Sequence, residues 1–264
     1  MAILVYILLS VLIVSLVSLI GILTVTLHKK HLHRALSLFV GFAAGALLSA
    51  TFFDLLPESI EIAGIEKTSM YALLGIVVFF ALEKFFFWYH CHGGRCAHHG
   101  ISVKKSVKPY AYLNLIGDGI HNFIDGMVIA GAYVASVPLG VITSLAVVFH
   151  EIPQETGDFA ILVNAGLSTT KALLLNFLTA VSAIIGALVA YFFLQTVDNF
   201  TAFLLPFAAG NFVYIATADL IPELHKESSM RRNLEQMIMF LLGIVVIILL
   251  EKLIASGALN RLFL

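Results

Sequence analysis

The sequence predicts an all-α membrane protein with eight transmembrane helices, on the strength of its composition, its long apolar stretches and an internal repeat. Of its 264 residues, 60% are hydrophobic and only 12% are charged, whereas about a quarter of the residues in a soluble domain are charged. This composition excludes an ordinary soluble domain and a disordered chain. No basic face is present, so nucleic acid is not an expected partner. The two cysteines are too few for a disulfide framework.

Each of eight apolar stretches is long enough to cross a bilayer as a helix, which takes about 20 residues. They cover residues 3–27, 35–56, 69–89, 111–134, 138–163, 170–195, 200–222 and 236–256. The first stretch follows no basic residue and exceeds the length of a signal-peptide core, so we expect it to remain as a span. We therefore expect one transmembrane domain over residues 1–264, with the lipid bilayer as its surroundings.

The positions of Lys and Arg predict the orientation, because these residues favour the cytoplasmic side of a membrane. With the N-terminus outside, the outer side holds only Lys67, Lys252 and Arg261, and the inner side holds the other twelve. Eight spans return the C-terminus to the outside. We expect the plasma membrane as the location, with a His-rich loop, 90–108, in the cytoplasm.

Two sequence patterns occur twice. Phe-Ala-Ala-Gly, with an Asp twelve residues after its Phe, begins at Phe42 and at Phe207. Leu-Gly-Ile-Val-Val, with a Glu eight residues after its Gly, begins at Leu74 and at Leu242. The copies lie in spans 2 and 7 and in spans 3 and 8, which run in opposite directions. The sequence therefore predicts a 3+2+3 architecture, in which an inverted repeat surrounds a hairpin of spans 4 and 5. Transporters built this way hold substrate near the midplane, at the repeat interface.

The central hairpin carries acids without a basic partner nearby in sequence. No Lys or Arg lies between Lys108 and Lys171, but five acids do: Asp118, Asp125, Glu151, Glu155 and Asp158. An ionised acid at the centre of a membrane helix costs about 2.5–3.5 kcal/mol on insertion scales. Either protons or a bound cation must compensate for this cost.

The spacing of histidines and acids favours a cation. Residues four apart share a helix face, and three such pairs occur: His121 with Asp125, His150 with Gln154, and Glu151 with Glu155. The two histidines lie about equally far from the hairpin turn, so they reach the same depth. Imidazole and carboxylate ligands together suit a borderline divalent metal such as zinc.

These residues resemble the ZIP (Zrt/Irt-like) family of divalent metal transporters. From His121 the chain is H-N-F-I-D-G, like the family's H-N-x-x-[DE]-G. From His150 it is H-E-I-P-Q-E-T-G-D, like the H-E-x-P-x-E-x-G-D of one subgroup. The resemblance covers nearly the whole chain. It implies zinc as the substrate, with Fe²⁺, Mn²⁺ and Cd²⁺ as alternatives, carried into the cytoplasm without enzyme activity or a catalytic cofactor.

The resemblance also implies a site for two metal ions. The main position would be formed by four residues: His121, Asp125, His150 and Gln154. The second would use Asn122 and Glu151, and the remaining candidates in the hairpin are Asp118, Glu155 and Asp158. Two positions depart from the family pattern. Gln154 stands where many subgroup members have His, and span 6 offers Asn176 and Thr179 where some members have Glu.

Further candidate sites lie outside the hairpin. Asp54 and Glu58 end span 2 at the predicted entrance, and a matching group ends span 7 at the predicted exit: Asp219, Glu223 and His225. Acids at a mouth concentrate cations, although such residues also terminate helices near a proline. The inner loop carries a short Cys/His tract that suits a weak metal acceptor: His90, Cys91, His92, Cys96, His98 and His99.

Two other functions compete with metal transport. His150-Glu-x-x-Gln154 resembles the zincin motif of intramembrane metalloproteases, with the second His replaced and Pro153 interrupting the helix. A proton-coupled carrier of another substrate would use the same acids as a relay. Assembly as a homodimer also stays open.

Overall fold

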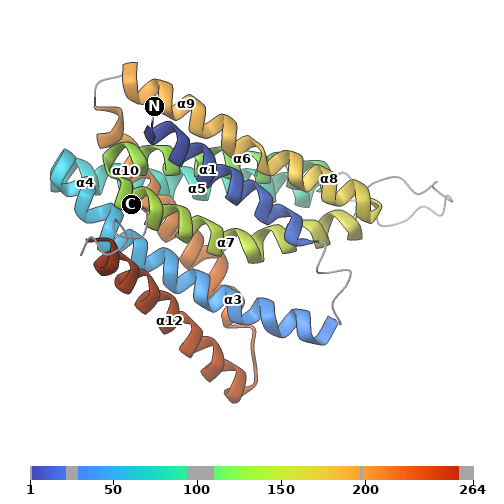
Figure 1. Ribbon diagram of the computed structural model, residues 1–264. Coiled ribbons are helices and arrows are strands. Elements are labelled where there is room, and N and C mark those ends of the chain that lie inside the picture. Colours follow the sequence, from blue (N-terminus) through green and yellow to red (C-terminus); the bar gives the residue numbers. More distant parts are fainter. Residues whose placement is uncertain (1, 22–28, 94–109, 197–198, 256–264) are drawn as a thin grey trace, which may run out of the picture.

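The computed structural model describes residues 2–21, 29–93, 110–196 and 199–255, and this part of the chain is almost entirely helical, without strands. Its α-helices are α1 (Ala2–Val17), α3 (Lys29–Ser49), α4 (Leu56–Ala63), α5 (Ile65–Gly93), α6 (Tyr110–Ala135), α7 (Val137–Asn164), α8 (Thr169–Ala180), α9 (Ser182–Thr196), α10 (Phe200–Tyr214), α11 (Ile221–Leu224) and α12 (Met230–Ala255). Figure 1 shows them as one elongated bundle.

The predicted spans correspond to these helices in order, which confirms an all-α membrane protein. Seven helical stretches among the described residues are long and apolar enough to cross a membrane. The remaining predicted span is α6, which has 26 residues and is less apolar because the polar residues of the central hairpin lie on it. Span 1 is helical as far as Gly21, and its last predicted residues lie outside the described part. α5 continues to Gly93, so the predicted inner loop begins later than residue 90.

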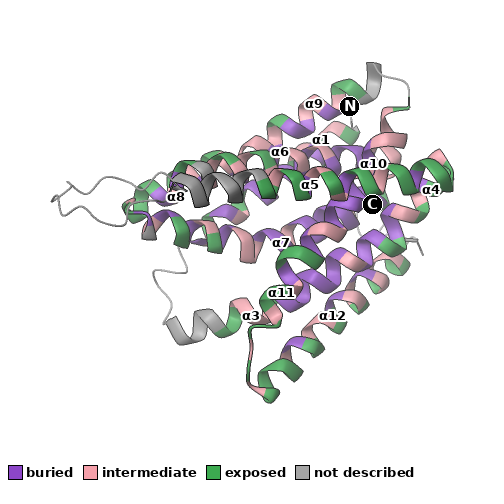
Figure 2. Cartoon of the chain, turned by 180° about the vertical axis from the view of Figure 1, so that it is seen from behind, coloured by how far each residue is buried: buried purple, intermediate pink, exposed green. Residues whose placement is uncertain are grey.

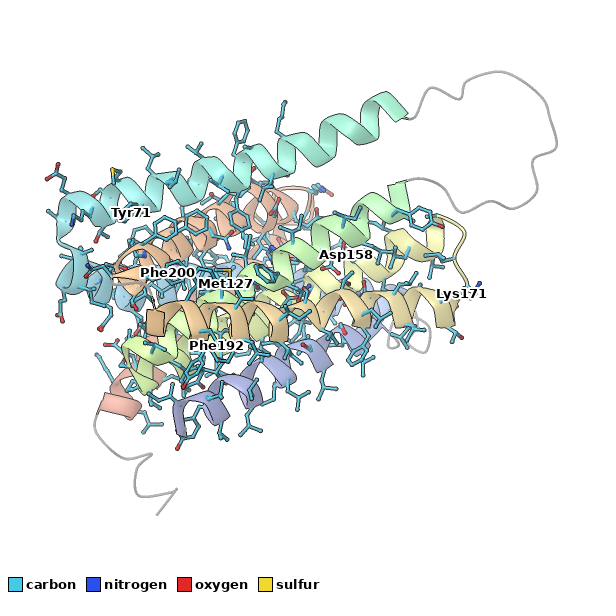
Figure 3. The ribbon with its side chains drawn as sticks, turned by 90° about the horizontal axis from the view of Figure 1, so that it is seen from above. Tyr71, Met127, Asp158, Lys171, Phe192 and Phe200 are labelled. Carbon is cyan, nitrogen blue, oxygen red and sulfur yellow. The ribbon has the colours of Figure 1, made fainter. Side chains whose placement is uncertain are left out.

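The positions of the helix ends are those expected for an even number of membrane crossings. In Figure 1 the beginning of α1 and the end of α12 lie at the same end of the bundle as α4. The beginnings of α3 and α8 lie at the opposite end. Lys171, near the beginning of α8, is seen at that end in Figure 3.

Close helix contacts confirm the inverted repeat. A Cβ on Gly243 of α12 would lie 2.2 Å from the carbonyl oxygen of Phe42 on α3, and a Cβ on Gly75 of α5 would lie 2.2 Å from that of Phe207 on α10. These four residues are the matched positions of the two sequence patterns. A second matched pair of contacts joins the same helices: Gly45 with Phe240, and Gly210 with Ala72. Small residues let membrane helices approach closely, and the two equivalent helix pairs, α3 with α12 and α10 with α5, each join one helix from each half of the repeat.

The repeat also places a π-helical turn at the same point in each half. Residues Ala50–Leu55 (η2) join α3 to α4, and Ile215–Leu220 (η3) join α10 to α11. A proline follows each turn, as the second residue of α4 and of α11. Proline has no N–H and crowds the carbonyl four residues earlier, so the wider turn accommodates it. π-turns occur often at functional sites, and these two contain Asp54 and Asp219.

Burial follows the same organisation. Figure 2 shows buried residues concentrated where α3, α7 and α10 meet, with exposed faces on α5 and α12. Large apolar side chains remain exposed on those outer faces, among them Leu73, Leu241 and Leu249. In water such exposure would be costly, but in a bilayer these faces contact lipid. The polar hairpin residues lie in the interior instead.

Candidate metal site

The hairpin between α6 and α7 sets the depth of the site. Its turn is tighter than the sequence suggests, since Ser136 alone separates the two helices. The Ser136 hydroxyl accepts a hydrogen bond from the backbone N–H of Leu139 (3.2 Å), which caps α7. His121 lies 15 residues before Ser136 and His150 lies 14 residues after it. Two antiparallel helices with so short a turn bring both imidazoles to the same level.

Four side chains from this level converge on one point: His121, Asp125, His150 and Glu151. Their ligand atoms lie within 4.8 Å of one another. His121 Nε2 is 3.3 Å from His150 Nε2 and 3.6 Å from Asp125 Oδ2. His150 Nε2 is 2.9 Å from Asp125 Oδ2 and 3.8 Å from Glu151 Oε1. A zinc ion with ligand bonds of about 2.0–2.2 Å has tetrahedral edges of about 3.3–3.6 Å, so the group fits one ion.

The hydrogen bonding of His150 directs its lone pair toward this point. Nδ1 of His150 lies 3.2 Å from the carbonyl oxygen of Ala146, one turn earlier on α7, and donates its hydrogen there. In the neutral imidazole Nε2 then has a lone pair, and this atom faces the Asp125 carboxylate at 2.9 Å. Fixing one ring nitrogen in this way is how proteins orient a metal-binding imidazole. Lone pairs at such distances repel one another unless a proton or a cation lies between them.

Exposure distinguishes the four residues. Asp125, His150 and Glu151 are fully buried, while the His121 side chain keeps 12% of its surface exposed. His121 also lines the large cavity described below. Of the four, it is the residue that a cation in that cavity would reach first.

A second polar cluster lies beside the first, between α6, α7 and α8. Asn122 donates to Asp118 Oδ1 (2.8 Å), and the Thr179 hydroxyl donates to the other oxygen of Asp118. Asn176 donates to Glu155. Several buried oxygens in this cluster have no hydrogen-bond partner among the described residues: Asn122 Oδ1, both of Glu151, Glu155 Oε1 and Asn176 Oδ1. Of the two span 6 residues named from the sequence, Asn176 thus presents a neutral, unpaired oxygen to this cluster.

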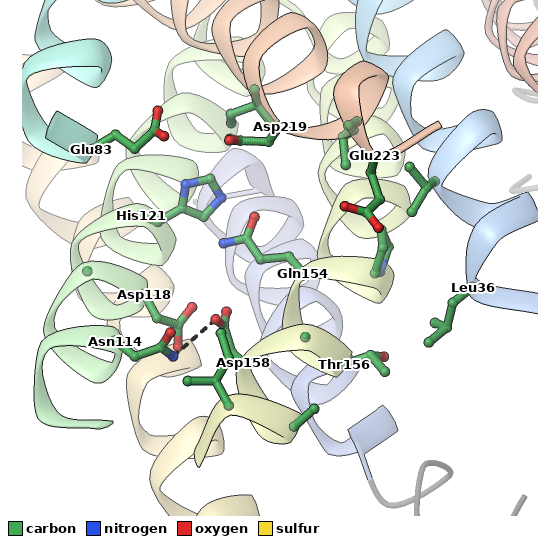
Figure 4. A pocket seen from close by; sticks show the side chains of 18 of the residues that line it. Leu36, Glu83, Asn114, Asp118, His121, Gln154, Thr156, Asp158, Asp219 and Glu223 are labelled. Atoms are coloured by element: carbon green, nitrogen blue, oxygen red, sulfur yellow. Dashed lines mark hydrogen bonds between the residues drawn. The ribbon is translucent and has the colours of Figure 1, made fainter. Parts of the chain in front are cut away.

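The other hairpin candidates lie farther along α7. Asp158 accepts a hydrogen bond from Asn114 of α6 (3.0 Å), as Figure 4 shows. Gln154 faces the same space as His121 in Figure 4, and both residues line the cavity. Figure 3 places Asp158 inside the bundle.

A cavity of about 900 Å³ joins the site to one end of the bundle. His121, Asp118 and Asp158 line its inner part, and Glu223 and Lys226 line its outer rim. Asp219 also lines it, so two of the three predicted exit residues face this space. His225 is exposed but is not among the lining residues.

Apolar packing closes the path from the site to the opposite end. Tyr133 of α6, Leu139 and Ile142 of α7 and Leu205 of α10 belong to one buried cluster there. The predicted entrance residues lie at this closed end and do not line the cavity: Asp54 is 8% exposed and Glu58 is half-buried. The site is thus open to one side only.

The predicted Cys/His loop site falls largely outside the described residues. His90, Cys91 and His92 belong to the last turn of α5, where only the backbone is described. Cys96, His98 and His99 lie in 94–109, outside the described part.

Sequence reasoning missed a hydrogen-bonded pair that lines the cavity. Tyr214 of α10 donates a hydrogen bond to Glu83 of α5. Glu83 is the Glu that follows Gly75 by eight residues in the repeated Leu-Gly-Ile-Val-Val pattern, so the repeat contained the information needed to identify it. Tyr214 has no repeated counterpart, because Ser49 stands at the equivalent position.

Comparison with known proteins is consistent with this geometry. The model of the ZIP zinc transporter family matches residues 1–105 and 89–251. The chain is 30% identical over 248 residues to zinc transporter ZIP13 of Mus musculus, covering 80% of this chain and 69% of that protein. It is 39% identical over 152 residues to zinc transporter zipt-7.2 of Caenorhabditis elegans, covering 56% of this chain and 33% of that protein. These relatives have the names of transporters, not of enzymes.

Proposed function

The chain belongs to the ZIP zinc transporter family, and we propose that it carries divalent metal ions, zinc foremost, across the membrane into the cytoplasm. The observation that carries this proposal is the convergence of four side chains whose ligand atoms lie within 4.8 Å of one another: His121, Asp125, His150 and Glu151. Two imidazoles and two carboxylates match zinc better than they match Mg²⁺ or Ca²⁺, which prefer oxygen ligands alone. Zinc here is the substrate. Fe²⁺, Mn²⁺ and Cd²⁺ remain alternative substrates for the same ligands.

The direction of transport follows from charge. Basic residues gather at the end where the cavity opens: Arg34, Lys84, Lys171, Lys226, Arg231 and Arg232. Only Lys67 and Lys252 lie at the closed end among the described residues. Because Lys and Arg favour the cytoplasmic side, the cavity opens to the cytoplasm. In the plasma membrane this orientation gives uptake from outside.

Different residues of the site and its two ends act at different steps of the transport cycle. The central group binds the ion after water is lost, and His121 presents it to the inner cavity. Asp219 and Glu223 then attract the ion toward the cytoplasm, as acids near a mouth do. Asp54 and Glu58 serve the corresponding role at the outer mouth, in the state where the apolar cluster at that end has opened. The second cluster, with Asn122, Glu151 and Glu155, would hold a second ion.

Metal uptake by purified protein in liposomes tests the proposal. We expect saturable zinc uptake by the parent protein, with a panel of Fe²⁺, Mn²⁺ and Cd²⁺ measured alongside. The His150→Ala variant serves as the control, because it removes the most buried imidazole of the group. Uptake that is the same in this variant, or absent from the parent for every metal, would contradict the proposed function.

A further inference from the structure

Asn211 of α10 is a buried side chain without an evident structural role. It is fully buried, and neither its Nδ2 nor its Oδ1 has a hydrogen-bond partner among the described residues. Leaving a buried amide unpaired costs free energy. We expect an unpaired buried amide where a water molecule, an ion or another conformation of the protein supplies the missing partner.

The inverted repeat supplies an internal reference for this position. Asn211 corresponds to Ala46 of α3, four residues after Phe207 and Phe42 respectively. The backbone contacts are equivalent, since a Cβ on Gly243 would lie 2.9 Å from the Ala46 nitrogen and one on Gly75 would lie 3.2 Å from the Asn211 nitrogen. An alanine therefore satisfies the packing in one half. The carboxamide in the other half is not required by the fold.

Neighbouring contacts place Asn211 at the depth of the metal site. The ring of Phe212, the next residue, lies 5.9 Å from that of His150. Phe207, four residues earlier on the same helix face, contacts Phe79, whose ring lies 6.4 Å from that of His121. Asn211 thus lies on α10 where this helix meets the neighbours of both histidines. Every other candidate ligand at this depth belongs to the central hairpin or to α8.

We propose that Asn211 is a selectivity residue whose side-chain carbonyl contacts the divalent cation, or a water of its hydration shell, as the ion enters the central site. The contact is transient, which explains why the amide is unpaired when the path from the closed end is sealed. A neutral amide oxygen adds a ligand without adding charge, so it discriminates between metals by ligand preference. This inference rests on the proposed function of the central site.

Replacing Asn211 with the residue of its repeat partner tests the inference. In Asn211→Ala we expect zinc uptake in liposomes to fall by about tenfold in kcat/KM and the ratio of zinc to cadmium uptake to change. We expect the melting temperature to stay the same or rise, because an unpaired amide has been removed. Asn211→Asp, which restores an oxygen ligand, should recover uptake. If Asn211→Ala does not fold, Asn211→Ser takes its place.

Thr68→Val is the matched control. Thr68 is also buried with an unpaired hydroxyl, but it lies near the beginning of α5, away from the site. We expect this variant to keep the parent's kcat, KM and metal ratio. If the Asn211 variants keep the parent's kcat, KM and metal ratio, the inference is overturned and the proposed function stands. Loss of zinc uptake by the parent itself would instead overturn the proposed function, and the role of Asn211 with it.

Discussion

The orientation of His150 shows how the backbone of α7 positions a side chain of the candidate metal site. Its Nδ1 donates to the Ala146 carbonyl on the same helix, so the backbone of α7 fixes the plane of the ring. Its Nε2 then faces Asp125 and His121 at 2.9 and 3.3 Å. A cation at this point neutralises the carboxylates and separates the lone pairs. We therefore expect the packing of these buried side chains to depend on an ion bound here or on protons that replace it.

The two histidines should be indispensable for tight zinc binding. We expect His121→Ala and His150→Ala each to abolish high-affinity binding, since each removes one of two imidazole ligands. Gln154→Ala should have a smaller effect, because a neutral amide is the weakest ligand of the group. Isothermal titration of zinc into each folded variant measures this, with the melting temperature as a check on folding. Parent affinity in both histidine variants would show that the hairpin does not bind the metal.

Zinc binding should also weaken as the pH falls. A metal-bound imidazole must be neutral, and a free imidazole takes up a proton near pH ~6.5. Below that pH we expect the affinity to fall by about tenfold per pH unit for each histidine that must lose a proton. Titrations in buffers with different ionisation enthalpies count the protons released. An affinity that is constant between pH 7.5 and 5.5 would exclude both histidines as ligands.

At the residue level, spacing along the sequence predicted which side chains meet. The pair of His121 and Asp125 follows from i, i+4 spacing on one helix, and the meeting of His121 with His150 follows from a hairpin of two helices. Spacing within one helix cannot identify partners on another helix, however. The contact of Asn176 with Glu155 and the burial of Asn211 depend on how α8 and α10 pack against the hairpin. Periodicity carries no information on that packing.

At the level of elements, the sequence predicted the spans and the repeat but not the π-turns. Pro57 and Pro222 suggest helix ends, because proline lacks the N–H that continues a helix. In the structure the chain continues through both positions, because a wider turn precedes each proline. The turns bring Asp54 and Asp219 to equivalent places at opposite ends of the bundle. The inverted repeat thus places an acid at an equivalent point near each end of the bundle.

The helix pairs of the repeat should depend on their glycines. A Cβ on Gly210 would lie 1.9 Å from the carbonyl oxygen of Ala72, so Gly210→Ala must separate α10 from α5. We expect a loss of about 1–3 kcal/mol, as for overpacked cores, seen as a lower melting temperature in detergent. Gly157→Ala is the control, since nothing lies within 4 Å of its Cβ position. Equal melting temperatures for the two variants would mean that the close contact is not needed.

For the whole molecule, the two ends of the bundle differ although the repeat makes them alike in topology. One end is open as far as His121, and apolar side chains around Tyr133 and Leu205 close the other. A symmetric repeat can adopt the mirror arrangement by exchanging the conformations of its halves, which exposes the site to the other side. The sequence predicts that both arrangements are available to the chain. The sequence does not predict which arrangement the chain adopts, because the two arrangements differ in side-chain packing and share the same hydrophobic pattern.

The orientation of this asymmetry can be tested by labelling. In a background with Cys91→Ser and Cys96→Ser, we introduce Lys67→Cys at the closed end and Lys226→Cys at the rim of the cavity. With the cavity facing the cytoplasm, a membrane-impermeant maleimide should label Lys67→Cys in intact cells. It should label Lys226→Cys, whose parent side chain is 71% exposed, only after permeabilisation. Labelling of Lys226→Cys in intact cells would reverse the topology, and Asp219 and Glu223 would then form the entrance for the metal instead of its exit.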